Sequence, residues 1–131
     1  MVCAHAQTTT LTFKSGRATV KNTLQPRRES DAHFYSLRLR KGQPVGIKVI
    51  AKGLFLSKEN ECSVFFQLFD NRGEAVFIGD DMVGIDVWDG EVQKTGGYKI
   101  KVYMSCLEGF TAAELRKKKL TFNYTLDVRM K

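Results

Sequence analysis

Apolar and polar residues alternate along most of this chain, and the alternation is clearest near its C-terminus. Phe122, Tyr124, Leu126, Val128 and Met130 occupy every second position, with polar residues between them. In a β-strand successive side chains point to opposite faces, so this period of two predicts a strand with one buried face. A helix would spread the same residues around its circumference.

The same period recurs upstream, and turn residues separate its segments. Residues 64–69 are apolar on both faces, which is typical of a strand in the middle of a sheet. The Asp-Asn-Arg-Gly sequence at 70–73 favours a turn, so residues 75–78 are predicted to return as the partner strand. Further strands are predicted at residues 11–13, 17–24, 35–39, 45–49 and 98–104. Seven or eight strands with frequent turns predict an all-β fold, an antiparallel β-sandwich, in which only residues 111–117 have helical composition.

The length suits one domain, which we assign to residues 7–131. Ala4-His5-Ala6 resembles the end of a secretory signal, so residues 1–6 are read as the remnant of an export signal or as added residues. Alternatively, Cys3 is the lipid-bearing cysteine of a lipoprotein. No apolar run approaches the roughly 20 residues that cross a bilayer, so no membrane span is expected.

The chain is basic, with a formal net charge of +7. Such a charge suits an acidic partner, but here it is spread along the sequence. Its densest run, residues 116–119, precedes the last predicted strand and is read as a solvated loop. A nucleic-acid or anionic-surface binder would need Arg27, Arg28 and this run on one face. We expect no nucleic-acid partner.

Motifs for catalysis and for metal or cofactor binding are absent from the sequence, so we expect neither an enzyme nor a bound cofactor. His33 stands beside Asp31 without a nucleophile pattern and is read as a surface histidine. Residues 79–91 carry five acidic residues around Trp88. Their oxygens could hold Ca²⁺, but the spacing does not match a calcium loop, and a solvated loop is the preferred interpretation.

Two cysteines, Cys62 and Cys106, lie within the predicted domain, and both flank predicted strands. In an oxidising compartment they could form a disulfide worth roughly 4 kcal/mol through loop closure. The alternative is a pair of buried free thiols. Neither cysteine belongs to a CxxC motif, so zinc-ligand spacing is absent.

The segment Thr95-Gly96-Gly97-Tyr98 is the most suggestive candidate site. Two glycines before a strand permit a tight turn whose backbone can approach another surface closely. Thr95 offers a hydroxyl group, and Tyr98 offers an aromatic ring with a polar tip. A plain hairpin turn is the alternative.

Three short motifs resemble the bacterial pre-peptidase C-terminal domain. They are Tyr-x-Leu-x-Leu-x-Lys-Gly-Gln at 35–43, Leu-Phe-Asp-x-x-Gly at 68–73 and Gly-Gly-Tyr-x-Ile-x-Val at 96–102. Among relatives of that domain, the chain from Leu11 onward most resembles the periplasmic inhibitors of g-type lysozyme. Its closing residues, 123–131, are similar to the end of those inhibitors.

The resemblance implies a function and a set of contact residues. In the inhibitor family a Ser-Gly-x-Tyr loop enters the lysozyme cleft, and Thr95, Gly96, Gly97 and Tyr98 match it with Thr in place of Ser. Arg116 is the best match to a basic contact residue before the last strand, and Tyr35 is a further candidate.

We therefore expect a periplasmic or secreted inhibitor that blocks the active-site cleft of g-type lysozyme with a protruding loop. The alternative is a non-catalytic accessory domain that binds a glycan or a protein, which exposed aromatics such as Trp88 and Tyr103 in a row would support.

Overall fold

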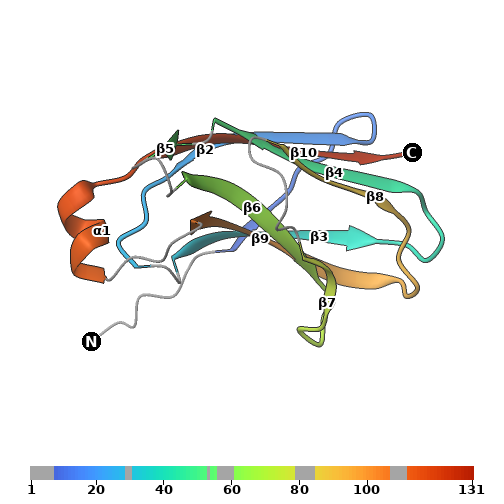
Figure 1. Ribbon diagram of the computed structural model, residues 1–131. Helices are drawn as coiled ribbons and strands as arrows, with labels where there is room; N and C mark the ends of the chain where they lie inside the picture. Colours follow the sequence, from blue (N-terminus) through green and yellow to red (C-terminus); the bar gives the residue numbers. More distant parts are fainter. Residues whose placement is uncertain (1–7, 29–30, 53, 56–60, 79–84, 107–111) are drawn as a thin grey trace.

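The alternating segments form two β-sheets that stack face to face (Figure 1). The computed structural model describes residues 8–28, 31–52, 54–55, 61–78, 85–106 and 112–131. Its elements are β1 (Thr8–Thr10), β2 (Arg17–Leu24), β3 (Ala32–Leu39), β4 (Val45–Ala51), β5 (Leu54–Phe55), β6 (Glu61–Phe69), β7 (Ala75–Ile78), β8 (Ile85–Gly90), β9 (Gly96–Cys106), α1 (Ala112–Lys118) and β10 (Phe122–Met130). The predicted all-β sandwich is confirmed, and short strands such as β5 raise the strand number above the seven or eight expected.

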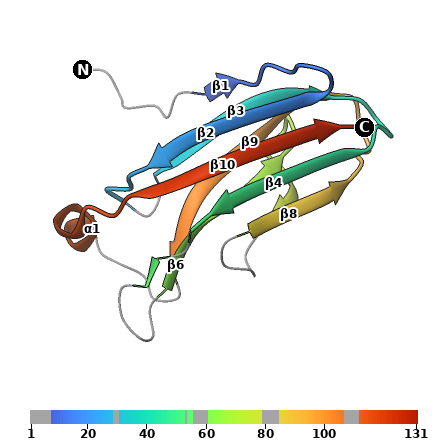
Figure 2. The same cartoon turned by 90° about the horizontal axis from the view of Figure 1, so that it is seen from above.

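Both sheets are built mainly from antiparallel pairs. One sheet has the strand order β1-β3-β9-β6-β5, with β7 also paired to β6, and the other has the order β2-β10-β4-β8. The pairing of β1 with β3 is parallel. Figure 2 shows the four-stranded sheet from its outer side, with α1 at one end of the molecule and the C-terminus at the other.

The core lies between the sheets and is filled by the alternating residues, as predicted. Leu126 and Val128 of β10 are fully buried, and so are Ile100 and Val102 of β9. Burying one such side chain stabilises the fold by about 1.5–3 kcal/mol. Along β6 both faces are covered, since outward-facing Phe65 is only 6% exposed.

Three segments differ from the prediction. Residues 116–118 of the basic run, read as part of a solvated loop, belong to α1. Residues 11–13 are not a strand, because β1 ends at Thr10. Residues 85–90, expected as part of an acidic loop, form β8, which pairs with β4. The strand tolerates its acidic sequence because buried Asp86 accepts a hydrogen bond from the Phe66 N–H at 3.0 Å, which compensates for lost hydration.

Cys62 and Cys106 form the predicted disulfide, with a Cα–Cα distance of 4.0 Å. They stand directly opposite each other on β6 and β9. The bond joins two central strands near the end of the sandwich that carries α1 (Figure 1).

Candidate functional site

The segment from Thr95 to Tyr98 lies at the end of the sandwich opposite α1 (Figure 1). Gly96 and Gly97 are the first residues of β9 and pair with Leu39 and Arg38 of β3. Thr95 and Gly97 are exposed. The candidate contact residues therefore combine the last loop residue before β9 with the outermost part of that strand.

A hydrogen bond fixes Thr95 to the connection between β3 and β4. Thr95 Oγ1 accepts from the Lys41 N–H at 2.9 Å. A backbone bond from the Gly42 N–H to the Val92 carbonyl, at 3.1 Å, joins the same two connections. The Thr95 hydroxyl keeps its own proton available for donation, because a hydroxyl group donates as well as accepts.

Tyr98 supports this turn from inside the sandwich. Its side chain is only 5% exposed and belongs to the core. The phenol O–H donates to the Lys94 carbonyl at 2.5 Å. Sequence reasoning offered Tyr98 as a contact residue, and the structure places its ring against the core rather than on the surface.

Gly96 and Gly97 leave space at the surface because they have no side chains. Neither has a positive φ, so the backbone freedom expected of them is not used. A Cβ atom placed on Gly97 would meet no other atom within 4 Å. The strand is therefore open above Gly97, and another molecule can approach its backbone there.

A groove of about 940 Å³ adjoins this opening. Its wall residues come from the β1–β2 connection, from the outer faces of β3 and β9, and from the β6–β7 hairpin. They include Phe13, Phe34, Phe69, Arg38, Arg72 and Gly97. The groove thus offers apolar surface with guanidinium groups beside it, and its size suits a peptide segment or a small ligand.

The other two candidate residues lie elsewhere. Arg116 is exposed on α1, beyond the far end of β9 from Thr95 (Figure 1). An 11-residue strand spans roughly 35 Å, so Arg116 is too distant to share one narrow contact with Thr95. Tyr35 is 2% exposed. The structure does not bring Arg116 or Tyr35 to the Thr95 turn.

Tyr35 belongs to a polar cluster between the sheets. Its hydroxyl hydrogen-bonds to the Tyr124 hydroxyl and accepts from Asn22 Nδ2 at 3.2 Å. His33 Nδ1 lies 2.7 Å from the same Tyr124 hydroxyl. Burial lowers the pKa of His33, and burial together with Tyr35 raises the pKa of Tyr124. Neutral forms of both groups suit a structural cluster at this sandwich edge.

Sequence reasoning missed Lys41, Arg38 and Phe69, which surround the Thr95 turn and the groove. The alternation of residues 35–39 puts Arg38 on the solvent side of its strand, and Arg38 is exposed. Its position opposite Gly97 depends on the register of β3 against β9. No local signal in the sequence gives that register.

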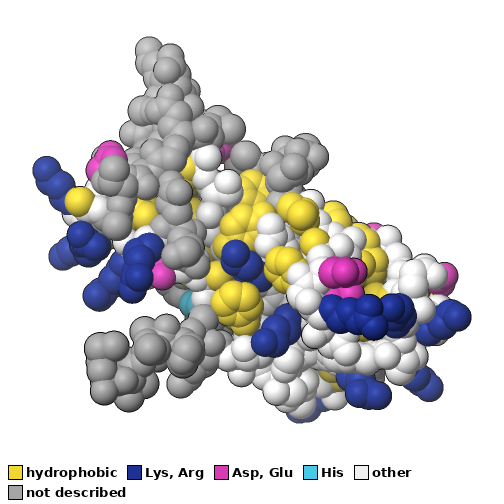
Figure 3. Space-filling model, turned by 90° about the horizontal axis from the view of Figure 1, so that it is seen from below, with side chains coloured by type: hydrophobic (Ala, Val, Ile, Leu, Met, Phe, Trp, Pro, Cys, Tyr) yellow, Lys and Arg dark blue, Asp and Glu magenta, His cyan; other side chains and the backbone are white. Residues whose placement is uncertain are grey.

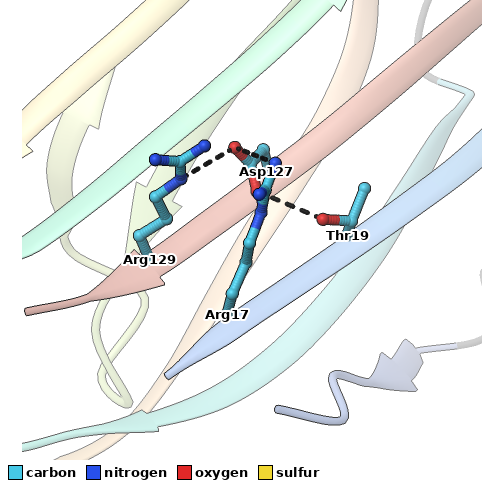
Figure 4. A network of polar contacts seen from close by, with 4 residues as sticks. All are labelled: Arg17, Thr19, Asp127 and Arg129. Atoms are coloured by element: carbon cyan, nitrogen blue, oxygen red, sulfur yellow. Dashed lines mark hydrogen bonds and ion pairs between the residues drawn. The ribbon is translucent and has the colours of Figure 1, made fainter. Parts of the chain in front are cut away.

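A second polar network crosses the outer face of the four-stranded sheet (Figure 4). Asp127 is 6% exposed and accepts from Arg17 Nε at 2.9 Å, from Arg129 Nε at 3.3 Å and from Thr19 Oγ1 at 3.2 Å. Burial alone would raise the pKa of Asp127, but Arg17 and its neighbours outweigh burial and lower it. The network joins β2 to β10. It also engages the Asp127 carboxylate, which is therefore not free to bind a ligand.

The structure describes only part of the acidic stretch at residues 79–91 around Trp88. Residues 79–84, on which part of the calcium alternative depended, lie outside the described residues. Within the described ranges no cluster of three or more potential metal ligands occurs.

Trp88 belongs to the four-stranded sheet and Tyr103 to the other, so they form no row of aromatics. No helix in the described ranges has the length and apolar character of a membrane span.

Fold and site together define a small β-sandwich with an open strand end beside an amphipathic groove. Solved structures from two groups of proteins share this fold along nearly their whole length. PliG from Aeromonas hydrophila, a periplasmic inhibitor of g-type lysozyme, is 22% identical, with a TM-score of 0.62 over 95% of this chain and 96% of that chain. The pre-peptidase C-terminal domain of a Bacillus anthracis collagenase is 13% identical, with a TM-score of 0.64 over 98% and 100% of the two chains.

A mutant PliG from Escherichia coli, also a periplasmic inhibitor of g-type lysozyme, is 14% identical. Its TM-score is 0.52 over 95% of this chain and 97% of that chain. No protein-family model matches the sequence, and no curated protein matches it. The two groups suspected from the sequence motifs are therefore both found among the structural neighbours, and at these low identities the likeness shows the fold alone.

Proposed function

We propose that this protein is a periplasmic or secreted inhibitor of g-type lysozyme that inserts its Thr95–Gly97 end into the enzyme's active-site cleft. The observation that carries the proposal is the full-length structural likeness to PliG, combined with an exposed, open strand end at the matching Thr-Gly-Gly-Tyr segment. A bacterial cell would gain protection of its wall from such a protein.

The chemistry of the contact follows from the groups that face outward. Lysozymes cleave glycosides with a carboxylic acid in a cleft. The Thr95 O–H can donate to such a group, and exposed Arg38, opposite Gly97, can add a guanidinium. Charge-assisted hydrogen bonds of this kind in a desolvated cleft are worth about 1.5–3 kcal/mol each.

The remaining family-matched residues take different parts in this proposal. Tyr98 holds the turn through its bond to Lys94, and Tyr35 supports β3 from the core. Arg116 lies outside the inserted end, because β9 separates it from Thr95. Lys41 and Arg38 supply the positive charge that the resemblance would assign to Arg116.

A lysis assay tests the proposal. Purified protein is added to bacterial cell-wall suspensions with g-type, c-type or i-type lysozyme, and the clearing rate is followed. We expect a saturable fall in the rate for the g-type enzyme. An unchanged g-type rate at protein concentrations well above that of the enzyme contradicts the proposal.

A second candidate function is a non-catalytic accessory domain that binds a glycan or a protein. It is favoured by the outer face of the six-stranded sheet, where hydrophobic side chains lie beside Lys and Arg side chains (Figure 3). Tyr103 packs against Phe65 at 6.3 Å between ring centroids, and the Lys101 ammonium lies 5.5 Å from the Tyr103 ring centroid. Sedimentation with insoluble peptidoglycan, compared between wild type and Tyr103→Ala, tests this function without any lysozyme.

A further inference from the structure

A basic pocket lies at the α1 end of the sandwich, away from the Thr95 turn. It has a volume of about 370 Å³. Two segments far apart in the sequence line it, and they contribute Gln25, Pro26, Arg27, Leu115, Arg116 and Lys119. Figure 3 shows Lys and Arg side chains gathered at this end of the molecule. Folding therefore brings Arg27 to Arg116 and Lys119 of the basic run, which is part of the arrangement that an anionic-surface binder would need.

The described residues that line the pocket carry positive charge and no negative charge. None of the described residues that line it carries a carboxylate. Asp31 follows Arg27 closely in the sequence, but its Oδ2 accepts from the backbone N–H groups of Arg27 at 2.9 Å and Arg28 at 3.1 Å. That carboxylate fixes the turn that presents Arg27, and neither described salt bridge involves a pocket residue.

Lys119 is held in an unusual backbone conformation. Its φ is 50°, and its N–H donates to the Leu115 carbonyl at 3.1 Å, which closes α1. Glycine or asparagine is normally favoured at such a helix end, because a side chain is strained there. Cations near a helix C-terminus also interact favourably with the helix dipole, but that interaction does not require a lysine at the strained position.

The floor of the pocket is apolar. Leu115 is fully buried and Pro26 is buried, whereas Arg27, Arg116 and Lys119 are exposed around them. Guanidinium groups bind phosphate oxygens in a two-pronged geometry, and an ammonium group adds a compact charge. An apolar floor can contact the organic part of the same ligand.

We propose that this pocket binds a phosphate monoester, presented either by a soluble phosphorylated molecule or by a lipid headgroup. This pocket is distinct from the proposed lysozyme contact, because the length of β9 lies between them. The protein would then have two independent binding ends.

The experiment measures phosphate binding in the absence of lysozyme. Inorganic phosphate and pyrophosphate are titrated calorimetrically at low salt, and sedimentation is measured with phosphatidylcholine vesicles with and without phosphatidic acid. We expect binding to pyrophosphate, to phosphatidic acid vesicles or to both. Binding to pyrophosphate alone identifies a soluble ligand, and binding to the acidic vesicles identifies a lipid headgroup.

Two variants separate a binding role from a structural one. Arg116→Gln should weaken phosphate binding about tenfold, because one charge-assisted contact is lost. Lys119→Gly should weaken binding by a similar factor and raise the melting temperature, because glycine relieves the positive φ. A purely structural lysine would show the stability gain without the loss of binding, which would contradict the proposal.

The matched control removes the same charge at the opposite end. Arg40→Gln with Lys14→Gln should bind phosphate as wild type does, and Arg116→Gln with Lys119→Gln should not. Equal losses in the two pairs, or no binding of wild type to either probe, overturn the proposal. Because lysozyme is absent from every arm, these outcomes do not depend on the inhibitor function.

Discussion

Two hydroxyl groups hold the turn at the start of β9 from different sides. The Thr95 hydroxyl accepts from the Lys41 backbone, and the Tyr98 hydroxyl donates to the Lys94 carbonyl. A neutral hydrogen bond of this type contributes about 1 kcal/mol to stability. The Tyr98 ring adds a separate and larger contribution through burial, so the roles of ring and hydroxyl can be distinguished by substitution.

Tyr98→Phe should keep the fold, cost about 1 kcal/mol and weaken inhibition slightly, because the ring remains and the bond to Lys94 is lost. Tyr98→Ala should cost about 3–5 kcal/mol, because it leaves a cavity in the core. Urea unfolding measures both costs. A stable Tyr98→Ala protein that no longer inhibits lysozyme would instead assign the ring to the contact surface.

Asp127 makes stability depend on acid pH. Its pKa is lowered in the folded protein, so its contribution is present above the unfolded value of about 3.9 and is lost as the pH falls through the folded value. Asp127→Asn should therefore lower stability at pH 7 and flatten its decline below about pH 4. Unfolding curves at pH 7 and pH 3 check this, and an equally steep decline in the variant contradicts it.

Strands that carry their own alternation or turn residues could be predicted from the sequence. A strand that depends on a contact with a residue far away in the sequence could not. The alternation in β10 and the turn before β7 fix their own structure, and both predictions are confirmed. β8 was missed because Asp86 is satisfied by Phe66 of the other sheet. The Thr95 segment was found through its glycines, whereas its bond to Lys41 joins residues 54 positions apart and leaves no mark in the sequence.

The disulfide joins two central strands, so its removal should destabilise the whole sandwich. The bond spans 44 residues, and loop closure of that length is worth about 4 kcal/mol. Cys62→Ala with Cys106→Ala should lose stability of about this size in urea unfolding, with the far Thr95 turn still able to inhibit when folded. A loss below about 1 kcal/mol would show that strand packing, rather than the bond, dominates.

For the whole molecule, the central feature is the separation of two unlike ends by the length of β9. One end offers an open strand start beside an amphipathic groove, and the other offers a basic pocket. The sequence indicated the fold and the Thr95 segment, but the family resemblance grouped Arg116 with that segment. Whether Arg116 and Thr95 can share a site depends on which end of the sandwich each of them reaches. Strand lengths and the order of strands in the sheets together decide this.

The most direct test of the inhibitor account fills the space above Gly97. Gly97→Leu should fold at least as stably as wild type, because nothing lies within 4 Å of the added Cβ and leucine suits a strand better than glycine. Ser105→Leu adds the same side chain at an exposed position of the same strand, near its other end. The measurement is the inhibition constant against g-type lysozyme, with the melting temperature of each variant. The account predicts at least a thirtyfold loss for Gly97→Leu, equivalent to about 2 kcal/mol, and wild-type inhibition for Ser105→Leu. Full inhibition by a folded Gly97→Leu protein would contradict insertion of this end.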